Sequence, residues 1–227
     1  MTVLAFSARA NDWPQFLGPD RNGTSGESLS IAWSANSPKV LWKKPVGAGF
    51  AGPTVVSNTV ILFHRRGEGE ILEAFDAQNG NSKWQNDVPT AYRDDFGFDE
   101  GPRAVPVVAQ NRVYTFGAEG QLHALDLADG KRVWSVDTAR RFGVPKGFFG
   151  ASGSPLVEDG RVIANIGGRD NGKDAGIVAF DASTGAVQWT ATNHQASYSS
   201  AVGATLGGKR TAVFEVGGLD TGKLPKW

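Results

Sequence analysis

Several residue types and patterns are missing from this chain, and each absence excludes a class of protein. There is no cysteine, so disulfides, a cysteine nucleophile, thiolate metal sites and haem attached through cysteine are excluded. Lysine plus arginine and aspartate plus glutamate both number 23, which gives a formal net charge of zero. No Lys/Arg-rich run provides the basic surface of a nucleic-acid binder, and no apolar run approaches the ~18–20 residues that span a bilayer. We therefore expect neither a nucleic-acid partner nor a transmembrane segment.

Glycine and proline are plentiful: 30 glycines and 11 prolines stand against a single methionine in 227 residues. This composition predicts short strands joined by many turns, in one large all-β domain or two small domains. The N-terminal stretch ends in Ala8-Arg9-Ala10, the small-x-small form of a signal-peptidase site. We interpret residues 1–10 as the remnant of a signal peptide, with a disordered N-terminus as the alternative, and residues 11–38 as an N-terminal leader.

One pattern, Asp-x-x-x-Gly-x-x-x-Trp, occurs three times along the chain. Its tryptophans are 50 and 55 residues apart and the flanking residues match, so chance is a poor explanation. The regular spacing predicts a repeat architecture. The repeat residues are Asp76, Gly80 and Trp84; Asp126, Gly130 and Trp134; and Asp181, Gly185 and Trp189.

Each residue of this pattern has a physical role in a tight hairpin. The aspartate carboxylate can accept hydrogen bonds from backbone N–H groups inside the turn. The glycine can take a positive φ at the bulge that closes the hairpin. The tryptophan supplies a flat ring that buries roughly 150–250 Å² in the gap between neighbouring sheets. We therefore assign these residues to structure and not to chemistry.

A second recurring unit precedes each tryptophan hairpin. It starts at Gly52, Ala104 and Gly153, with a degenerate copy at Ser199, and consists of an apolar strand, a short polar turn and another apolar strand. Two hairpins per ~50 residues make a four-stranded antiparallel sheet, which is one blade of a β-propeller. The strands are apolar on both faces, as expected for sheets that are covered on both sides.

The predicted fold class is therefore all-β, a β-propeller of four-stranded antiparallel blades. Blades of this kind usually form rings of about seven or eight, so we expect a fragment of such a ring, with open edges that favour self-association. The partial propeller is assigned to residues 39–227, with full blades at 52–89, 102–138 and 151–192.

The two ends of the propeller region are irregular. Val40–Val46 looks like a lone outer strand with Trp42 in the tryptophan position, and it could close a four-bladed ring. At the other end the pattern is damaged, since Asp220 and Gly222 are too close together and Pro225 interrupts the strand before Trp227.

Three stretches resemble the pyrroloquinoline-quinone-like β-propeller repeat proteins: LDLADGKRVW, the opening DWPQFLGPDRNG from Asp12 to Gly23, and DDFGFDEGPRAVPVV from Asp94 to Val108. The likeness covers residues 11–216. Because these proteins are similar in repeat to the propeller lipoprotein of the outer-membrane β-barrel assembly machinery, the resemblance implies a periplasmic or secreted scaffold. Quinoprotein alcohol dehydrogenases, which use the quinone and calcium, resemble the chain only at the tryptophan hairpins. Many of them carry an adjacent cysteine pair, which is absent here.

Binding residues are expected on one face of the propeller. The loops between second and third strands share that face with the blade-to-blade connections, and both are expected to be long and polar here. His64–Glu70 is one such loop and Thr90–Arg103 is such a connection. The candidate ligand- or partner-binding residues are His64, Arg65, Arg66, Tyr92, Arg93, Asp94, Asp95, Asp99, Glu100, Arg103 and His194.

The four acids of the Thr90–Arg103 connection allow three interpretations. They could bind a hard cation such as calcium, although the spacing lacks the alternating oxygen ligands of a calcium loop. Arg93 and Arg103 could neutralise them instead, or the connection could bind a partner. His123 lies within a strand and is interpreted as structural, and no second histidine stands at the spacing of a zinc ligand.

No catalytic constellation emerges from these residues, since Ser152 and Ser154 match no nucleophile motif. The leading interpretation is a non-enzymatic propeller of the cell envelope that takes no cofactor and binds a protein or peptide. The alternative is a part of a quinoprotein dehydrogenase that uses pyrroloquinoline quinone and calcium.

Overall fold

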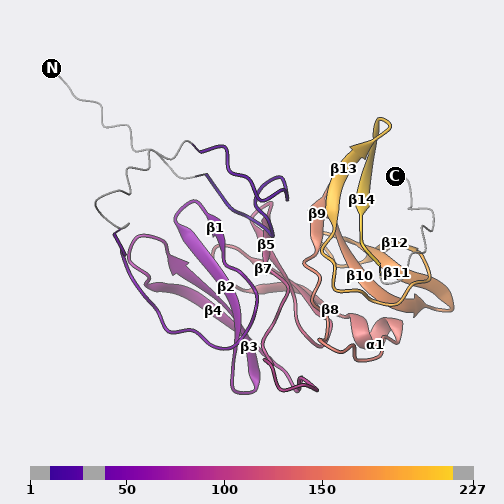
Figure 1. The fold of residues 1–227 in the computed structure, drawn as a ribbon, viewed down its shortest axis with the longest axis horizontal. Helices are drawn as coiled ribbons and strands as arrows, with labels where there is room; N and C mark the ends of the chain where they lie inside the picture. Colours follow the sequence, from indigo (N-terminus) through magenta and orange to yellow (C-terminus); the bar gives the residue numbers. More distant parts are fainter. Residues whose placement is uncertain (1–10, 28–38, 217–227) are drawn as a thin grey trace.

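The structure is a computed structural model of the 227-residue chain and describes residues 11–27 and 39–216. Its described part contains three four-stranded antiparallel sheets and one two-stranded hairpin, which follow one another in chain order (Figure 1). The prediction of an all-β partial propeller is confirmed. The signal-peptide interpretation of residues 1–10 and the irregular end at Asp220, Gly222, Pro225 and Trp227 lie outside the described residues.

The sheets correspond to the blades expected from the repeat. Each pairs its strands in sequence order, so that the first strand is at one edge and the fourth at the other. Blade 1 holds β1 (Thr54–Val56), β2 (Thr59–Arg66), β3 (Gly69–Asp76) and β4 (Ser82–Pro89); blade 2 holds β5 (Val107–Ala109), β6 (Arg112–Phe116), β7 (Gln121–Asp126) and β8 (Arg132–Asp137); blade 3 holds β9 (Leu156–Glu158), β10 (Arg161–Asp170), β11 (Lys173–Asp181) and β12 (Val187–Ala191); and the last hairpin holds β13 (Val202–Leu206) and β14 (Lys209–Val213).

The hairpins between first and second strands close with two-residue turns. In blade 2 the turn residues Gln110 and Asn111 both have positive φ, 49° and 59°. Positive φ at both positions is the signature of a type I′ turn, whose twist matches that of the flanking strands. The polar pairs between apolar segments in the sequence therefore mark tight turns.

The tryptophan hairpins have the same local geometry in successive blades. In blade 2 the Asp126 carboxylate accepts a hydrogen bond from the Ala128 N–H at 2.9 Å, and Gly130 has a φ of 70°. The ring of Trp84, from blade 1, lies directly against Gly130, where a Cβ atom would come within 2.4 Å of it. The Trp84 Nε1 donates to the Leu127 carbonyl at 2.9 Å, so the ring joins blade 1 to blade 2.

The apolar core is divided into clusters that lie between neighbouring sheets. Ile61 and Leu72 of blade 1 pack with Val113 and Leu125 of blade 2. A larger cluster joins blade 2 to blade 3, and a third joins blade 3 to the β13–β14 hairpin. Both faces of the inner blades are thus covered, which explains why their strands are apolar throughout.

The leader crosses the first strands of the blades. Trp13 forms an antiparallel bridge with Val55 of β1, and the Pro14 carbonyl accepts a hydrogen bond from the Val108 N–H of β5 at 2.8 Å. Further along, the guanidinium of Arg21 is buried and donates to the carbonyls of Pro155 and Ala201, which precede β9 and β13. The leader therefore connects all three blades and the last hairpin.

Two expectations about the loops differ from the structure, and one connection contains a helix. The stretch from His64 to Glu70 is not an open loop, because β2 and β3 continue to a two-residue turn at Gly67 and Glu68. The other loops between second and third strands are also short, so only the blade-to-blade connections are long. One of them begins with a five-residue helix, α1 (Thr138–Phe142), which was not expected and is too short to span a membrane.

Val40–Val46 does not close a four-bladed ring. Its residues belong to no strand, and the segment lies at the opposite end of the row of blades from β13 and β14 (Figure 1). Trp42 nevertheless lies against Gly80 of blade 1, and its Nε1 donates to the Ala77 carbonyl at 2.9 Å. The segment thus repeats the contact that blades 1 and 2 make with the blades that follow them.

Candidate functional site

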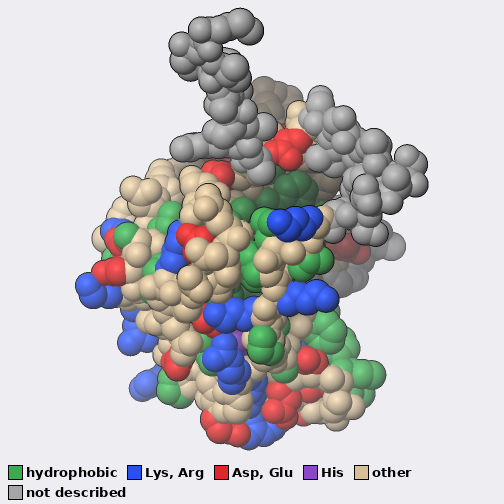
Figure 2. Space-filling model, turned by 90° about the vertical axis from the view of Figure 1, so that its left-hand side faces the viewer, with side chains coloured by type: hydrophobic (Ala, Val, Ile, Leu, Met, Phe, Trp, Pro, Cys, Tyr) green, Lys and Arg blue, Asp and Glu red, His purple; other side chains and the backbone are tan. Residues whose placement is uncertain are grey.

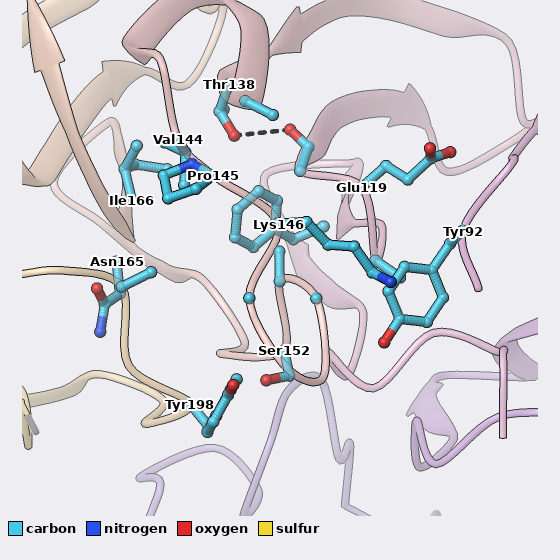
Figure 3. Close-up of a pocket in the computed structure, with 18 of the residues that line it drawn as sticks. Tyr92, Glu119, Thr138, Val144, Pro145, Lys146, Ser152, Asn165, Ile166 and Tyr198 are labelled. Atoms are coloured by element: carbon cyan, nitrogen blue, oxygen red, sulfur yellow. Dashed lines mark hydrogen bonds between the residues drawn. The ribbon is translucent and has the colours of Figure 1, made fainter. Parts of the chain in front are cut away.

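A cavity of about 320 Å³ opens where the blade-to-blade connections meet. Its walls come from the connection after β4, the turn between β6 and β7, the connection that contains α1, strand β10 and the connection after β12. Figure 3 shows Lys146 extending across the cavity toward Tyr92, with Ser152 and Tyr198 at the end opposite Thr138. These segments begin and end at strands of blades 1, 2 and 3. The cavity therefore forms only when the blades pack against one another.

Several polar side chains line the cavity, among them Ser152, Asn165 and Lys146. The Ser152 hydroxyl is buried and has no hydrogen-bond partner among the described residues. The Asn165 amide nitrogen of β10 donates to the Ser197 hydroxyl at 2.6 Å. The Lys146 ammonium forms an ion pair with Asp95 at 2.5 Å, and this hydrogen bond raises the pKa of the lysine. An unpartnered buried hydroxyl is costly unless a ligand or water satisfies it.

Aromatic rings flank this polar group. Tyr92 is 2% exposed, and burial raises the pKa of its phenol. The Lys146 ammonium lies 5.5 Å from the centre of the Tyr92 ring, and the Tyr198 hydroxyl accepts a hydrogen bond from the Phe149 N–H at 3.3 Å. A flat ligand that carries hydrogen-bond acceptors would match these walls.

A buried carboxyl supports the wall from behind. Glu70 of β3 is 2% exposed, and its Oε1 accepts a hydrogen bond from the Ala118 N–H in the β6–β7 turn at 2.8 Å. Burial raises the pKa of Glu70 to about 7, although this hydrogen bond acts in the opposite direction. The approach is so close that a Cβ atom on Gly117 would lie 2.1 Å from Glu70 Oε2. Blade 1 thereby holds the part of blade 2 that borders the cavity.

Of the residues predicted as candidates, Tyr92 and Arg93 line the cavity. Arg65 is 3% exposed, and its Nη1 donates to the carbonyls of Tyr92 at 2.7 Å and Glu100 at 3.1 Å. It therefore anchors the connection after β4 to blade 1. Arg66 instead pairs with Glu73 at 2.7 Å within blade 1.

The four acids of this connection bind cations and backbone groups of the chain itself. Asp94 accepts hydrogen bonds from the N–H groups of Phe96, Phe98 and Asp99, the first of which contributes most to lowering its pKa. Asp95 pairs with Lys146, Glu100 with Arg65 and Arg93, and Asp99 accepts hydrogen bonds from the N–H groups of Gly49 and Gly101. Arg103 lies 3.6 Å from Asp94. Internal neutralisation is thus the arrangement present, and the described residues contain no group of three acids or histidines that could hold a metal.

The histidines do not take part in the cavity. His64 lies in β2, where its Nδ1 accepts a hydrogen bond from the Gly47 N–H at 3.0 Å and burial lowers its pKa. His123 is buried within β7, as expected, and burial lowers its pKa to about 4. His194 lies beside Gly176 of β11 and is not among the cavity residues.

Lys146, Ser152, Asn165 and Tyr198 were missed as a group by the sequence analysis. The connection between β8 and β9 that supplies two of them is as long as Thr90–Arg103 and lies outside the repeat. Long connections were expected to carry binding residues, and the same expectation applied to this connection would have identified Lys146 and Ser152. Asn165 could not be found in this way, because it lies within a strand whose pattern gives no sign of function.

The architecture defines a protein of the quinoprotein-like β-propeller class. A family model described as "Outer membrane protein assembly factor BamB" matches residues 23–94 and 68–223, and the chain belongs to that family. This confirms the resemblance deduced from the repeat.

Curated relatives of the chain are dehydrogenases. It is 31% identical over 202 residues to a quinohemoprotein alcohol dehydrogenase of Comamonas testosteroni, an alignment that covers 82% of this chain and 26% of the relative. It is 32% identical to the quinohemoprotein alcohol dehydrogenase ADH-IIG of Pseudomonas putida, with 71% of this chain and 21% of the relative covered. The chain therefore spans about a fifth to a quarter of the length of these proteins.

Solved structures give the same architecture. The crystal structure of the Comamonas testosteroni enzyme matches with a TM-score of 0.58 and 26% identity over 82% of this chain and 28% of that one. A europium-containing methanol dehydrogenase matches with a TM-score of 0.53 over 73% of this chain and 29% of that one, at 22% identity, and so supports the fold alone.

These relatives correct two expectations. The expectation that no cofactor is involved is wrong, because the matched enzymes are named as quinone-dependent or quinohaem alcohol dehydrogenases. The comparisons also favour the dehydrogenase alternative over the scaffold interpretation.

The cavity residues fit the quinone better than the calcium. Pyrroloquinoline quinone is a flat ring system that carries carboxylates, and the unpartnered Ser152 hydroxyl, the Lys146 ammonium and the Asn165 amide are suitable donors for its oxygens. A calcium ion needs six or more oxygen ligands, usually including carboxylates. The lining carboxylate Glu119 already accepts hydrogen bonds from Thr90 and Ala91, and Asp95 is paired with Lys146. The described part of the chain offers no metal-binding cluster.

Proposed function

We propose that this chain forms blades of a quinone-dependent alcohol dehydrogenase of the cell envelope and that its cavity contributes to binding the quinone. The observation that carries this proposal is the coincidence of 31% identity to a quinohemoprotein alcohol dehydrogenase with a cavity that contains an unpartnered buried hydroxyl. When bound, such a quinone accepts the electrons removed from an alcohol. The residues of this chain would orient it: Ser152 and Asn165 by hydrogen bonds and Lys146 by its charge.

Binding of pyrroloquinoline quinone to the full chain tests this proposal. Titration followed by tryptophan fluorescence and calorimetry, with and without calcium, should show saturable binding. Ser152→Ala and Lys146→Gln should each weaken it by about tenfold, since each removes a hydrogen-bond donor to an anionic ligand. Lys131→Gln, at an exposed turn of blade 2, is the control with the same charge change. Absence of binding under both conditions would refute the proposal.

A second function, the presentation of a protein-binding face, is favoured by exposed aromatic rings beside the cavity. Phe96, Phe98 and Phe148 are 50%, 72% and 62% exposed, and the rings of Phe96 and Phe148 stack at 5.1 Å. Exposed apolar clusters of this kind mark interaction sites. The expected partner is an envelope protein or peptide, in a periplasmic or secreted setting, and the open blade edges offer a second route through self-association.

Crosslinking in an envelope extract distinguishes this function from quinone binding. A chain with Phe96→Ser and Phe148→Ser should lose a specific crosslinked protein while it retains quinone binding. Light scattering of the purified chain reports self-association separately. If the double variant captures the same proteins as the unmodified chain, the aromatic cluster has no part in recognition.

A further inference from the structure

A second hollow, a groove of about 570 Å³, is lined by the last three residues of α1, whereas the cavity described above is lined by the first two. It shares no lining residue with that cavity. Its walls are the C-terminal half of α1, the last part of β10, the start of β11 and the connection after β12. The polar side chains that line it are Arg140, Arg141, Arg169, Asp174, Asn193 and Gln195.

The arginines of this groove are weakly neutralised by the protein. The Arg140 guanidinium has no ion pair within the described residues. Arg141 lies 3.9 Å from Asp170 in a partly exposed pair, and Arg169 lies 3.5 Å from Asp174 in a largely exposed one. Exposed pairs of this kind contribute little and exchange readily with a better ligand. Three guanidinium groups against two carboxylates, the lining Asp174 and the neighbouring Asp170, leave the groove with a net positive charge.

The composition of the chain shows no such excess. On the side of the molecule that Figure 2 shows, which is the left-hand side of Figure 1, lysine and arginine side chains are interspersed with acids. The formal net charge of the chain is zero. A local excess of arginine is therefore a feature of this groove and not of the composition.

The backbone of β10 is irregular where it borders the groove. The pairing of β10 with β11 shifts register between Asn165 and Gly168, and Gly167 has a φ of 77°. A Cβ atom on Gly168 would lie 2.3 Å from the Phe142 carbonyl oxygen, so only glycine allows α1 to approach this closely. Bulges release backbone groups from the ladder and are common beside binding sites.

The position of Arg140 and Arg141 at the end of α1 has a purely structural explanation, because cations stabilise the C-terminus of a helix. That explanation does not extend to Arg169, which reaches the same groove from β10, nor to the two amides supplied by the connection after β12. Three separate segments thus direct hydrogen-bond donors to one place.

From this convergence we propose that the groove binds a phosphate group, as free phosphate or as a phosphate ester. Guanidinium groups pair with phosphate oxygens through two parallel hydrogen bonds, and the amide N–H groups of Asn193 and Gln195 supply uncharged donors. Phosphate also offers more acceptor oxygens than a carboxylate does, which suits several guanidinium groups. The proposal is independent of quinone binding, since the two hollows are lined by different residues.

Calorimetric titration of the full chain with inorganic phosphate and pyrophosphate, at constant ionic strength against chloride, tests the proposal. We expect saturable binding that Arg140→Gln and Arg169→Gln each weaken by about tenfold, because each loses a charge-assisted hydrogen-bond pair. Lys131→Gln, which makes the same charge change on an exposed turn, should leave the affinity unchanged. Both arginines are exposed, so the circular dichroism of the variants should match that of the unmodified chain.

A second arm identifies the source of the phosphate. Sedimentation with phosphatidylglycerol vesicles, against phosphatidylcholine vesicles, reports binding to a lipid headgroup. Calorimetric binding without sedimentation assigns the groove to soluble phosphates, and sedimentation that both arginine variants abolish assigns it to the headgroup. No binding in either arm, or equal weakening by Lys131→Gln, would overturn the proposal.

Discussion

The contact between a tryptophan ring and a glycine is the smallest unit from which this molecule is built. Trp42, Trp84 and Trp134 each lie against the glycine of the next hairpin, at Gly80, Gly130 and Gly185. Each indole N–H donates to a backbone carbonyl of the same hairpin. The glycine is needed twice over, for its positive φ and for the space that the ring occupies.

Substitution of Gly130 separates these two requirements. Gly130→Ala introduces a Cβ that would lie 2.4 Å from the Trp84 ring at a φ of 70°. Gly160→Ala introduces one at the same φ of 70° with no atom within 4 Å. We expect urea unfolding to show a loss of about 1–2 kcal/mol for Gly160→Ala, from backbone strain. Gly130→Ala should lose about 1–3 kcal/mol more, from the ring contact. Equal losses would show that the ring adds nothing.

Sequence reasoning succeeded at the residues that repeat. The pattern of Asp126, Gly130 and Trp134 recurs at fixed spacing because every blade needs the same turn and the same ring. The copies within one chain can therefore be compared with one another. Lys146 and Ser152 occur once, in a connection whose course is set by the blades on either side. No local pattern encodes where such a connection will place a side chain.

At the scale of the blade, a carboxyl buried between neighbouring sheets makes their contact sensitive to pH. Glu70 projects from blade 1 onto the Ala118 N–H of blade 2, close to Arg65 and Glu119. Its pKa is raised from 4.5 to about 7, chiefly by burial. The folded state therefore binds this proton more tightly than the unfolded chain does. The stability that results is complete below pH 4.5 and is lost as the pH rises through 7.

Glu70→Gln should remove this dependence. Relative to the unmodified protein, the free energy of unfolding of the variant should rise by up to about 3 kcal/mol between pH 4.5 and pH 8. The comparison cancels His123, whose pKa of about 4 makes its own contribution increase with pH. Urea unfolding at several pH values measures the difference.

Glu68→Gln provides a control of opposite sign. The hydrogen bond from Arg93 lowers the pKa of Glu68, so this group adds stability above its unfolded pKa and loses it as the pH falls. The Glu68 variant should thus become relatively less stable as the pH rises. A flat difference between Glu70→Gln and the unmodified protein would show that Glu70 does not titrate in this range.

The prediction of strands was better than the prediction of loops. Apolar segments separated by turn residues located the four strands of each blade. The charged stretch from His64 to Arg66 was interpreted as a loop, yet it continues β2, with His64 and Arg65 buried. Their partners, Gly47 and the connection after β4, come from outside the hairpin. A local pattern cannot show that a distant segment will satisfy a charged strand.

At the scale of the whole molecule, the leader joins blades that otherwise contact only their neighbours. Its buried residue Arg21 donates to Ala201 at 2.5 Å and to Pro155, and its Nε donates to Gln15 at 2.9 Å. Burial lowers the pKa of this guanidinium to about 10, so it remains charged at neutral pH. One side chain thus holds the start of β9 and the start of β13 to the leader.

Arg21→Lys should loosen this end of the molecule. A lysine keeps the charge but lacks the planar guanidinium with its several N–H donors, so at least one carbonyl loses its hydrogen bond. We expect the free energy of unfolding, measured in urea, to fall by about 1–3 kcal/mol. Amide exchange should become faster in β13 and β14 while blade 1 is unaffected. Arg140→Lys, at an exposed and unpaired arginine, is the matched control. Unchanged exchange in both variants would show that Arg21 does not support the hairpin.

The position of the leader also has a consequence for the order of events during synthesis. Arg21 bonds to residues 134 and 180 positions further along the chain. Tight hairpins form within microseconds, whereas contacts of such sequence separation close late. During synthesis Arg21 therefore stays without these acceptors until the segments before β9 and β13 have been made, whereas Trp13 can pair with Val55 much earlier. The two ends of the leader thus attach to the blades at different stages.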